Sequence, residues 1–113
     1  AVMGLQVRGK LMVLTMRLTP RLPAGSEDPT RPPKLNDGVL IDVELVDTAN
    51  LKRYVVVRDE RGLRIKSNDF TSQLHNGQPG LFTYTFAAPE ANVSALDVRY
   101  GQWPPFTNVP VQR

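Results

Sequence analysis

Apolar residues recur at every second position along most of this chain, which is the spacing of a β-strand with one buried face. In Leu11–Leu18, for example, Met12, Leu14, Met16 and Leu18 share one face. No window of helical length has the three-and-four spacing of an amphipathic helix. The pattern predicts an all-β fold. Strands are expected at Leu5–Arg8, Leu11–Leu18, Val39–Val46, Leu81–Ala87, Leu96–Tyr100 and Phe106–Val111.

The clearest of these strands is Val39–Val46. Its apolar residues Val39, Ile41, Val43 and Leu45 are expected to face the core, while the acidic residues between them face water. We therefore expect this strand in the middle of a sheet.

Two connections are also predicted. Tyr54–Arg58 and Leu63–Lys66 form a hairpin across Asp59–Gly62, a type I turn in which Gly62 takes a left-handed conformation. Gly62 is the residue we expect to be least replaceable. Residues 20–38 are rich in proline, a composition that supports neither a strand ladder nor a helix, and they are predicted to be a long loop.

Length and composition limit the fold and the chemistry. A chain of 113 residues fits one domain, residues 1–113, and seven or so strands separated by turns favour an antiparallel two-sheet sandwich. The sequence has no Cys, which excludes disulfides, thiolate zinc sites and a cysteine nucleophile. No segment approaches the roughly 18 apolar residues needed to span a bilayer.

Charge is modest overall but uneven along the chain. The formal net charge is +3, whereas Lys52–Lys66 holds six basic and two acidic residues and Asp37–Asp47 holds four acidic residues and no basic one. Opposite charges on neighbouring strands stabilise their pairing, which is the simplest reading of this pattern. Because the basic segment has one aromatic residue, Tyr54, a nucleic-acid partner is not expected.

No set of residues predicts catalysis. His75 is the single histidine, and no hydroxyl or acid stands at a spacing that indicates a triad, so we interpret it as a solvated turn residue. Asp42 and Glu44 fall on one side of a strand, where solvated faces commonly carry acids. We expect a protein that is not an enzyme and that uses no cofactor or metal.

The loop Gly101–Pro105 contains the single Trp between two strands. An exposed Trp103 held by two prolines would lose little entropy on binding a partner. The alternative, which we favour on sequence alone, is a structural role in which Trp103 caps one end of the sandwich. Phe106 follows directly and is considered with it.

Several segments resemble a group of bacterial cell-envelope domains. They are Asn50–Gly62, the turn Asn76–Gly80, the run Phe86–Pro89 and the closing run Trp103–Val111. The resemblance is to telokin-like, immunoglobulin-like extracellular domains of bacterial lipoproteins and envelope proteins. It implies a Greek-key sandwich at the cell envelope or outside the cell, with a possible lipid anchor outside this chain. Related domains often carry a Cys-containing stretch after the hairpin, where this chain has Ser67–Asp69.

Two functions follow as expectations. The first is a non-catalytic interaction or spacer module whose partner is a protein or the cell wall, contacted by Trp103, Phe106, Arg58, Arg61 and Arg64. The alternative is an electrostatic docking domain that binds anionic polymers or head groups through the basic hairpin of residues 52–66. The oligomeric state stays open, since either outer strand could pair between chains.

Overall fold

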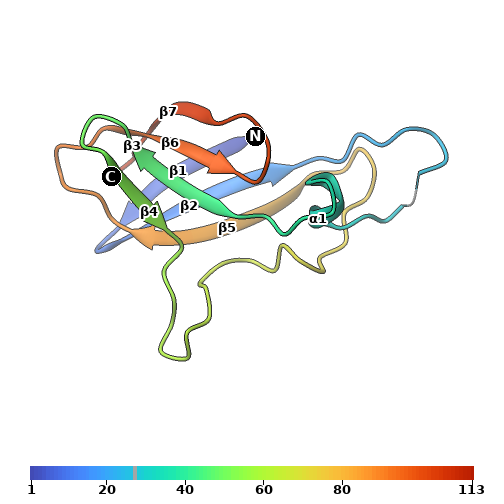
Figure 1. Cartoon of the computed structure of the whole chain (residues 1–113), viewed down its shortest axis with the longest axis horizontal. Coiled ribbons are helices and arrows are strands. Elements are labelled where there is room, and N and C mark those ends of the chain that lie inside the picture. Colours follow the sequence, from blue (N-terminus) through green and yellow to red (C-terminus); the bar gives the residue numbers. More distant parts are fainter. Residues whose placement is uncertain (27) are drawn as a thin grey trace.

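The computed structural model describes residues 1–26 and 28–113 and shows two packed β-sheets (Figure 1). The first sheet has the strand order β1-β2-β5 and the second has the order β4-β3-β6-β7. Every pairing between these strands is antiparallel, as predicted. The strands are β1 (Val2–Arg8), β2 (Leu11–Leu18), β3 (Val43–Asp47), β4 (Lys52–Val55), β5 (Gly80–Ala87), β6 (Ala95–Tyr100) and β7 (Phe106–Pro110).

The core lies between the sheets and consists of the residues that the period-two pattern selected. On β2, Met12, Leu14 and Met16 are almost fully buried, and each sits opposite a residue of a neighbouring strand that also faces inward. The predicted faces of β5 and β6 are confirmed too. Their buried aromatic and aliphatic residues are Phe82, Tyr84, Phe86, Leu96, Val98 and Tyr100.

The strand predicted at Val39–Val46 begins only at Val43, so the prediction of a strand for residues 39–42 was wrong. Val39 and Leu40 are 49% and 59% exposed, and Val39 does not face the core as expected. The reason is Asn36, whose side-chain Nδ2 donates to the carbonyl oxygens of both residues and so takes up groups that a ladder would use. The remaining strand, β3, does lie in the middle of its sheet.

The proline-rich segment 20–38 also differs from its prediction, because it contains a one-turn helix, α1 (Pro32–Leu35). Its prolines occupy the first helical positions, where a missing N–H costs nothing. The rest of the segment is a loop joined to the body at Thr30, which exchanges two backbone hydrogen bonds with Leu74. Residue 27 of this loop lies outside the described residues.

The predicted turn at Asp59–Gly62 forms and its tip projects away from both sheets (Figure 1), but the strands predicted beside it were wrong: β4 ends at Val55, and Arg58, Arg64 and Lys66 make only isolated bridges. Asp59 accepts from the N–H of Gly62, whose φ is 81°, and Arg58 lies opposite Arg64. The chain changes sheets before this turn: β4 belongs to the four-stranded sheet, whereas the Val57 N–H donates to the Thr85 carbonyl of β5. The base of the hairpin therefore lies along the outer edge of β5.

Candidate functional site

An apolar groove lies at one end of the sandwich, within the part of the chain that the structure describes. It has a volume of about 600 Å³ and lies where β2 and β6 end and β7 begins. Trp103 and Phe106, both selected from the sequence, line it together. The other lining residues are Ala1, Met16, Arg17, Leu18, Thr19, Pro20, Arg21, Leu35, Tyr100, Pro104 and Pro105.

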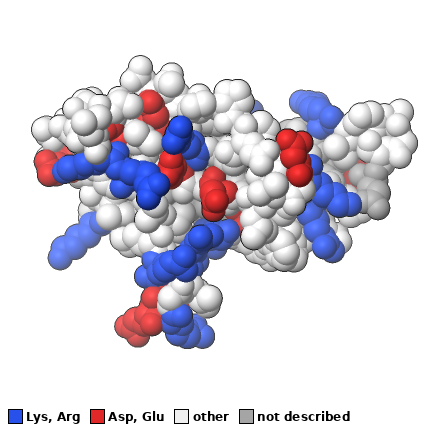
Figure 2. Space-filling view, viewed as in Figure 1, with Lys and Arg blue, Asp and Glu red and all other residues white. Residues whose placement is uncertain are grey.

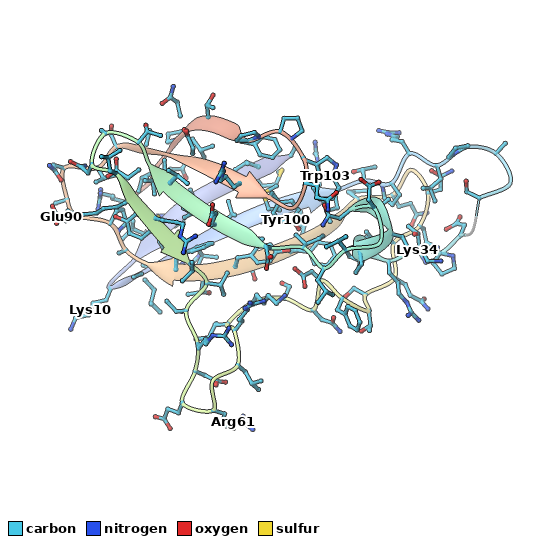
Figure 3. All side chains as sticks on the ribbon, viewed as in Figure 1. Lys10, Lys34, Arg61, Glu90, Tyr100 and Trp103 are labelled. Atoms are coloured by element: carbon cyan, nitrogen blue, oxygen red, sulfur yellow. The ribbon has the colours of Figure 1, made fainter. Side chains whose placement is uncertain are left out.

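Trp103 is fixed in this groove by stacking on Tyr100 (Figure 3). The two ring centroids are 5.7 Å apart and the rings are inclined by 19°. Trp103 is partly buried and packs against the core, so it caps the end of the sandwich, which is the structural role favoured from the sequence. It also forms one wall of the groove. Capping and partner contact are compatible in this position.

The turn before Trp103 depends on a close approach between Gly101 and Asn36. Gly101 has a φ of 57°, and a Cβ at this position would lie 2.6 Å from Asn36 Oδ1 and 3.0 Å from Trp103 Cζ3. The same Asn36 oxygen accepts a 2.7 Å hydrogen bond from the Gln102 N–H. Buried Asn36 thus connects the helix end to the Trp103 loop, and no sequence pattern indicates this role.

Behind Trp103, a chain of buried polar groups connects the two sheets. The hydroxyl of Tyr84 on β5 donates to Asp69 Oδ2 at 2.9 Å and lies 2.6 Å from the hydroxyl of Tyr100 on β6. Lys66 Nζ donates to the other Asp69 oxygen at 2.7 Å. Since the one proton of Tyr84 is directed at Asp69, Tyr100 is the donor to Tyr84.

Burial controls the ionisation of both phenols. Burial, together with the negative charge of Asp69, raises the pKa of Tyr100 to about 12. Burial, with the neighbouring Tyr100 and Asp69, also raises the pKa of Tyr84. Both hydroxyls therefore stay protonated at neutral pH and hold the stacked wall of the groove through hydrogen bonds.

The three arginines predicted as contacts lie away from the groove, on the hairpin. Arg58 donates to the Gly62 carbonyl at 2.8 Å, whereas the side chains of Arg61 and Arg64 have no partner among the residues described. Arg58 and Arg64 line a smaller hollow of about 210 Å³ that Tyr84 and Lys66 also border. The predicted contact residues therefore lie on two separate surfaces.

The charge pairing predicted between the acidic and basic segments holds in part. Glu44 on β3 contacts Arg53 of β4 at 3.4 Å, and it also contacts Arg99 of β6 at 3.0 Å, which the sequence did not suggest. Arg58, Arg61 and Arg64 take no part in these pairs. Glu44 acts here as an ion-pair residue between strands.

The other polar candidates are dispersed. His75 Nδ1 lies 3.4 Å from Asp28 Oδ1, while Asp42 lies just before β3 and its backbone carbonyl accepts from the Gly101 N–H. Within residues 1–26 and 28–113, no three His, Asp or Glu side chains gather in a way that could hold a metal ion. In the same part of the chain, no helix is long and apolar enough to cross a membrane.

Comparison with known proteins adds no relative. No protein-family model matches the sequence, and no curated protein or solved structure matches it either.

Proposed function

We propose that this chain is a non-catalytic interaction or spacer module of immunoglobulin-like fold, acting at a bacterial cell envelope or outside the cell. One observation carries the proposal: Trp103 and Phe106 line one apolar groove of about 600 Å³ that opens to solvent at the end of the sandwich. Clefts of this size and composition are typical of binding sites. The partner is a protein or a cell-wall component.

The strand order supports the immunoglobulin-like part of the proposal. In immunoglobulin domains, the first, second and fifth strands lie in one sheet and the third, sixth and seventh in the other, as β1, β2, β5 and β3, β6, β7 do here. The remaining edge of β5 is occupied by the segment after the hairpin, through Ser67 N–H to Thr83 O. The envelope location is supported by the sequence segments that resemble envelope domains.

The first experiment measures binding of the purified chain to isolated bacterial envelopes by co-sedimentation. We expect wild-type protein to sediment with them, and Trp103→Ala to reduce the bound fraction by about tenfold, since interface tryptophans often contribute more than 1 kcal/mol. Because Trp103 also packs on Tyr100, a second variant, Thr19→Tyr, fills the groove without removing a packed side chain.

The matched control is Leu81→Ser, which removes an exposed apolar side chain of β5 outside the groove lining. It should sediment like the wild type. Absence of binding to any envelope fraction, or equal binding by Thr19→Tyr, overturns the proposal.

A second candidate function is electrostatic docking to an anionic polymer through the hairpin. The observation in its favour is that Arg58 and Arg64 lie opposite each other on one face, with Arg61 at the turn. Acidic side chains accompany them at the tip (Figure 2). Asp59 is engaged locally, since its Oδ1 accepts from the N–H groups of Arg61 and Leu63.

Long-chain inorganic polyphosphate is a suitable probe for this candidate. If each of the three arginines contacts one phosphate, a fourfold rise in salt should lower the affinity by roughly twentyfold to fortyfold. Changing Arg58, Arg61 and Arg64 together to Gln should abolish binding. The same change at Arg8, Lys10 and Arg31, which removes equal charge outside the groove, should not; an affinity that is flat with salt rejects the candidate.

A further inference from the structure

We propose that the Trp103 groove recognises an extended acidic peptide segment: one apolar side chain of the peptide enters the groove, and carboxylates beside it contact Arg17 and Arg21. This inference rests on the proposed function, because it names the chemistry of the partner at that same groove. It commits to a peptide, as distinct from a polymeric phosphate or a lipid surface.

The floor of the groove suits one apolar anchor. Met16, Leu18 and Tyr100 are buried beneath it, and the partly buried rings of Trp103 and Phe106 form its side. An aliphatic or aromatic side chain placed there would exchange water for aromatic and aliphatic contacts, which is the main source of affinity in such pockets.

The charge of the groove is entirely positive. Arg17 and Arg21 are its charged side chains, both exposed, and its lining contains no Asp or Glu. Neither guanidinium has a hydrogen-bond or ion-pair partner among the residues that the structure describes. An arginine without a partner beside an apolar pocket is available for a carboxylate, with which it forms a short, charge-assisted hydrogen bond.

Nearby acidic groups do not cancel this charge. Asp42 and Glu44 line a different hollow, on the other side of the Trp103 loop, which shares Trp103 and Pro105 with the groove. There, Glu44 is already neutralised by its ion pairs with Arg53 and Arg99. The two sides of the Trp103 loop therefore differ in charge. An acidic ligand is attracted to the side of the apolar groove, because Arg17 and Arg21 lie there.

The groove continues into a second hollow, which favours an extended chain. This hollow has a volume of about 470 Å³, lies between β1 and β7, and shares Ala1 and Phe106 with the groove. Gln112 pairs with β1 by donating to the Leu5 carbonyl and accepting from Val7 N–H. Pro110, two residues earlier, has no N–H with which to continue this pairing towards Met3, so β1 keeps an open edge there.

The test is selection from a phage library of random dodecapeptides on the folded chain, followed by titration of synthetic winners. Trp103, the single Trp of the chain, reports binding by its fluorescence. We expect enriched peptides to carry an apolar residue flanked by Asp or Glu. The double variant R17E/R21E should weaken their binding by about tenfold, since each exposed charge pair contributes up to about 1 kcal/mol. The charge-matched double reversal R61E/R64E, on the hairpin, should leave binding unchanged.

The outcomes separate this inference from the proposed function. Enriched peptides that lack acidic residues, lose binding with Thr19→Tyr and bind R17E/R21E like the wild type would overturn the inference and leave the groove as a binding site. Absence of enrichment, or winners that bind Thr19→Tyr normally, overturns the inference, whereas the co-sedimentation experiment decides the proposed function separately. Winners that depend on Arg61 instead would assign peptide binding to the hairpin and also reject the inference.

Discussion

At the scale of single residues, Leu51 stands in a backbone conformation that its side chain does not favour. Its φ is 55°, and its side chain is 90% exposed in the turn between β3 and β4. For most residues this left-handed conformation costs about 1–2 kcal/mol, and Asn tolerates it better than Leu. Leu51 makes too little contact to offset that cost.

We predict that Leu51→Asn raises the free energy of unfolding by about 1 kcal/mol, measured by urea denaturation. The reciprocal control is Asn108→Leu, because Asn108 has a φ of 53° and is already a tolerant residue. That variant should lose about the same amount. If neither variant changes the free energy of unfolding, backbone strain at these turns does not contribute to the stability of the fold.

Sequence reasoning identified Gly62, whose role is local, and missed Asn36, whose contact with Gln102 is distant along the chain. Gly62 was placed in its left-handed conformation because a hairpin of that loop length requires one. Asn36 was missed because its importance comes from Gln102, which is 66 residues away along the chain. Nothing near Asn36 in the sequence indicates that contact.

At the scale of elements, period-two patterning predicted the strands and their faces because each strand has one face in the core. It failed at Val39 and Leu40, where apolar residues continue the alternation but the Asn36 side chain binds their carbonyl groups. It also missed α1, since proline was read as a helix breaker although it suits the first helical turn. The first case depends on side-chain hydrogen bonds and the second on the position of proline within a helix. The spacing of apolar residues contains neither kind of information.

The change of sheet near Val56 is a further element-scale feature that the pattern could not supply. Val56 is buried, β4 ends at Val55, and Val57 already bonds to β5 in the other sheet. The pattern of apolar and polar residues along Tyr54–Arg58 is the same whether the segment pairs with one sheet or with two. For this reason the turn at Asp59–Gly62 was correctly predicted, whereas the extent of the strand before it and the position of the hairpin at the edge of β5 were not.

At the scale of the whole molecule, the candidate site was predicted only in part. Trp103 and Phe106 were found because a single Trp between prolines stands out in the sequence. Arg17 and Arg21 were not, because they join the groove only when the end of β2 is brought beside the loop after β6. The hairpin arginines formed a cluster in the sequence and proved to belong to a separate surface.

The hydrogen bond between Tyr84 and Tyr100 links the two sheets, and the burial of the two phenols makes the stability of the whole molecule depend on alkaline pH. Both phenols have a raised pKa in the folded chain, with that of Tyr100 at about 12. In the unfolded chain each phenol ionises near its ordinary pKa of about 10. The unfolded state therefore loses these protons first, and the stabilisation that is complete below pH 10 is lost as pH rises towards the folded-state pKa values.

We predict that the free energy of unfolding, measured in urea at a series of pH values, falls above about pH 10 by roughly 1.4 kcal/mol per pH unit for each of the two phenols. The double variant Tyr84→Phe/Tyr100→Phe is less stable at neutral pH because Asp69 loses the Tyr84 hydroxyl as a donor. It should nevertheless show a correspondingly shallower decline above pH 10, and its phenolate absorbance should lack the late-titrating component. If wild type and variant lose stability in parallel between pH 10 and 12, the paired hydroxyls do not couple the packing of the two sheets to proton binding.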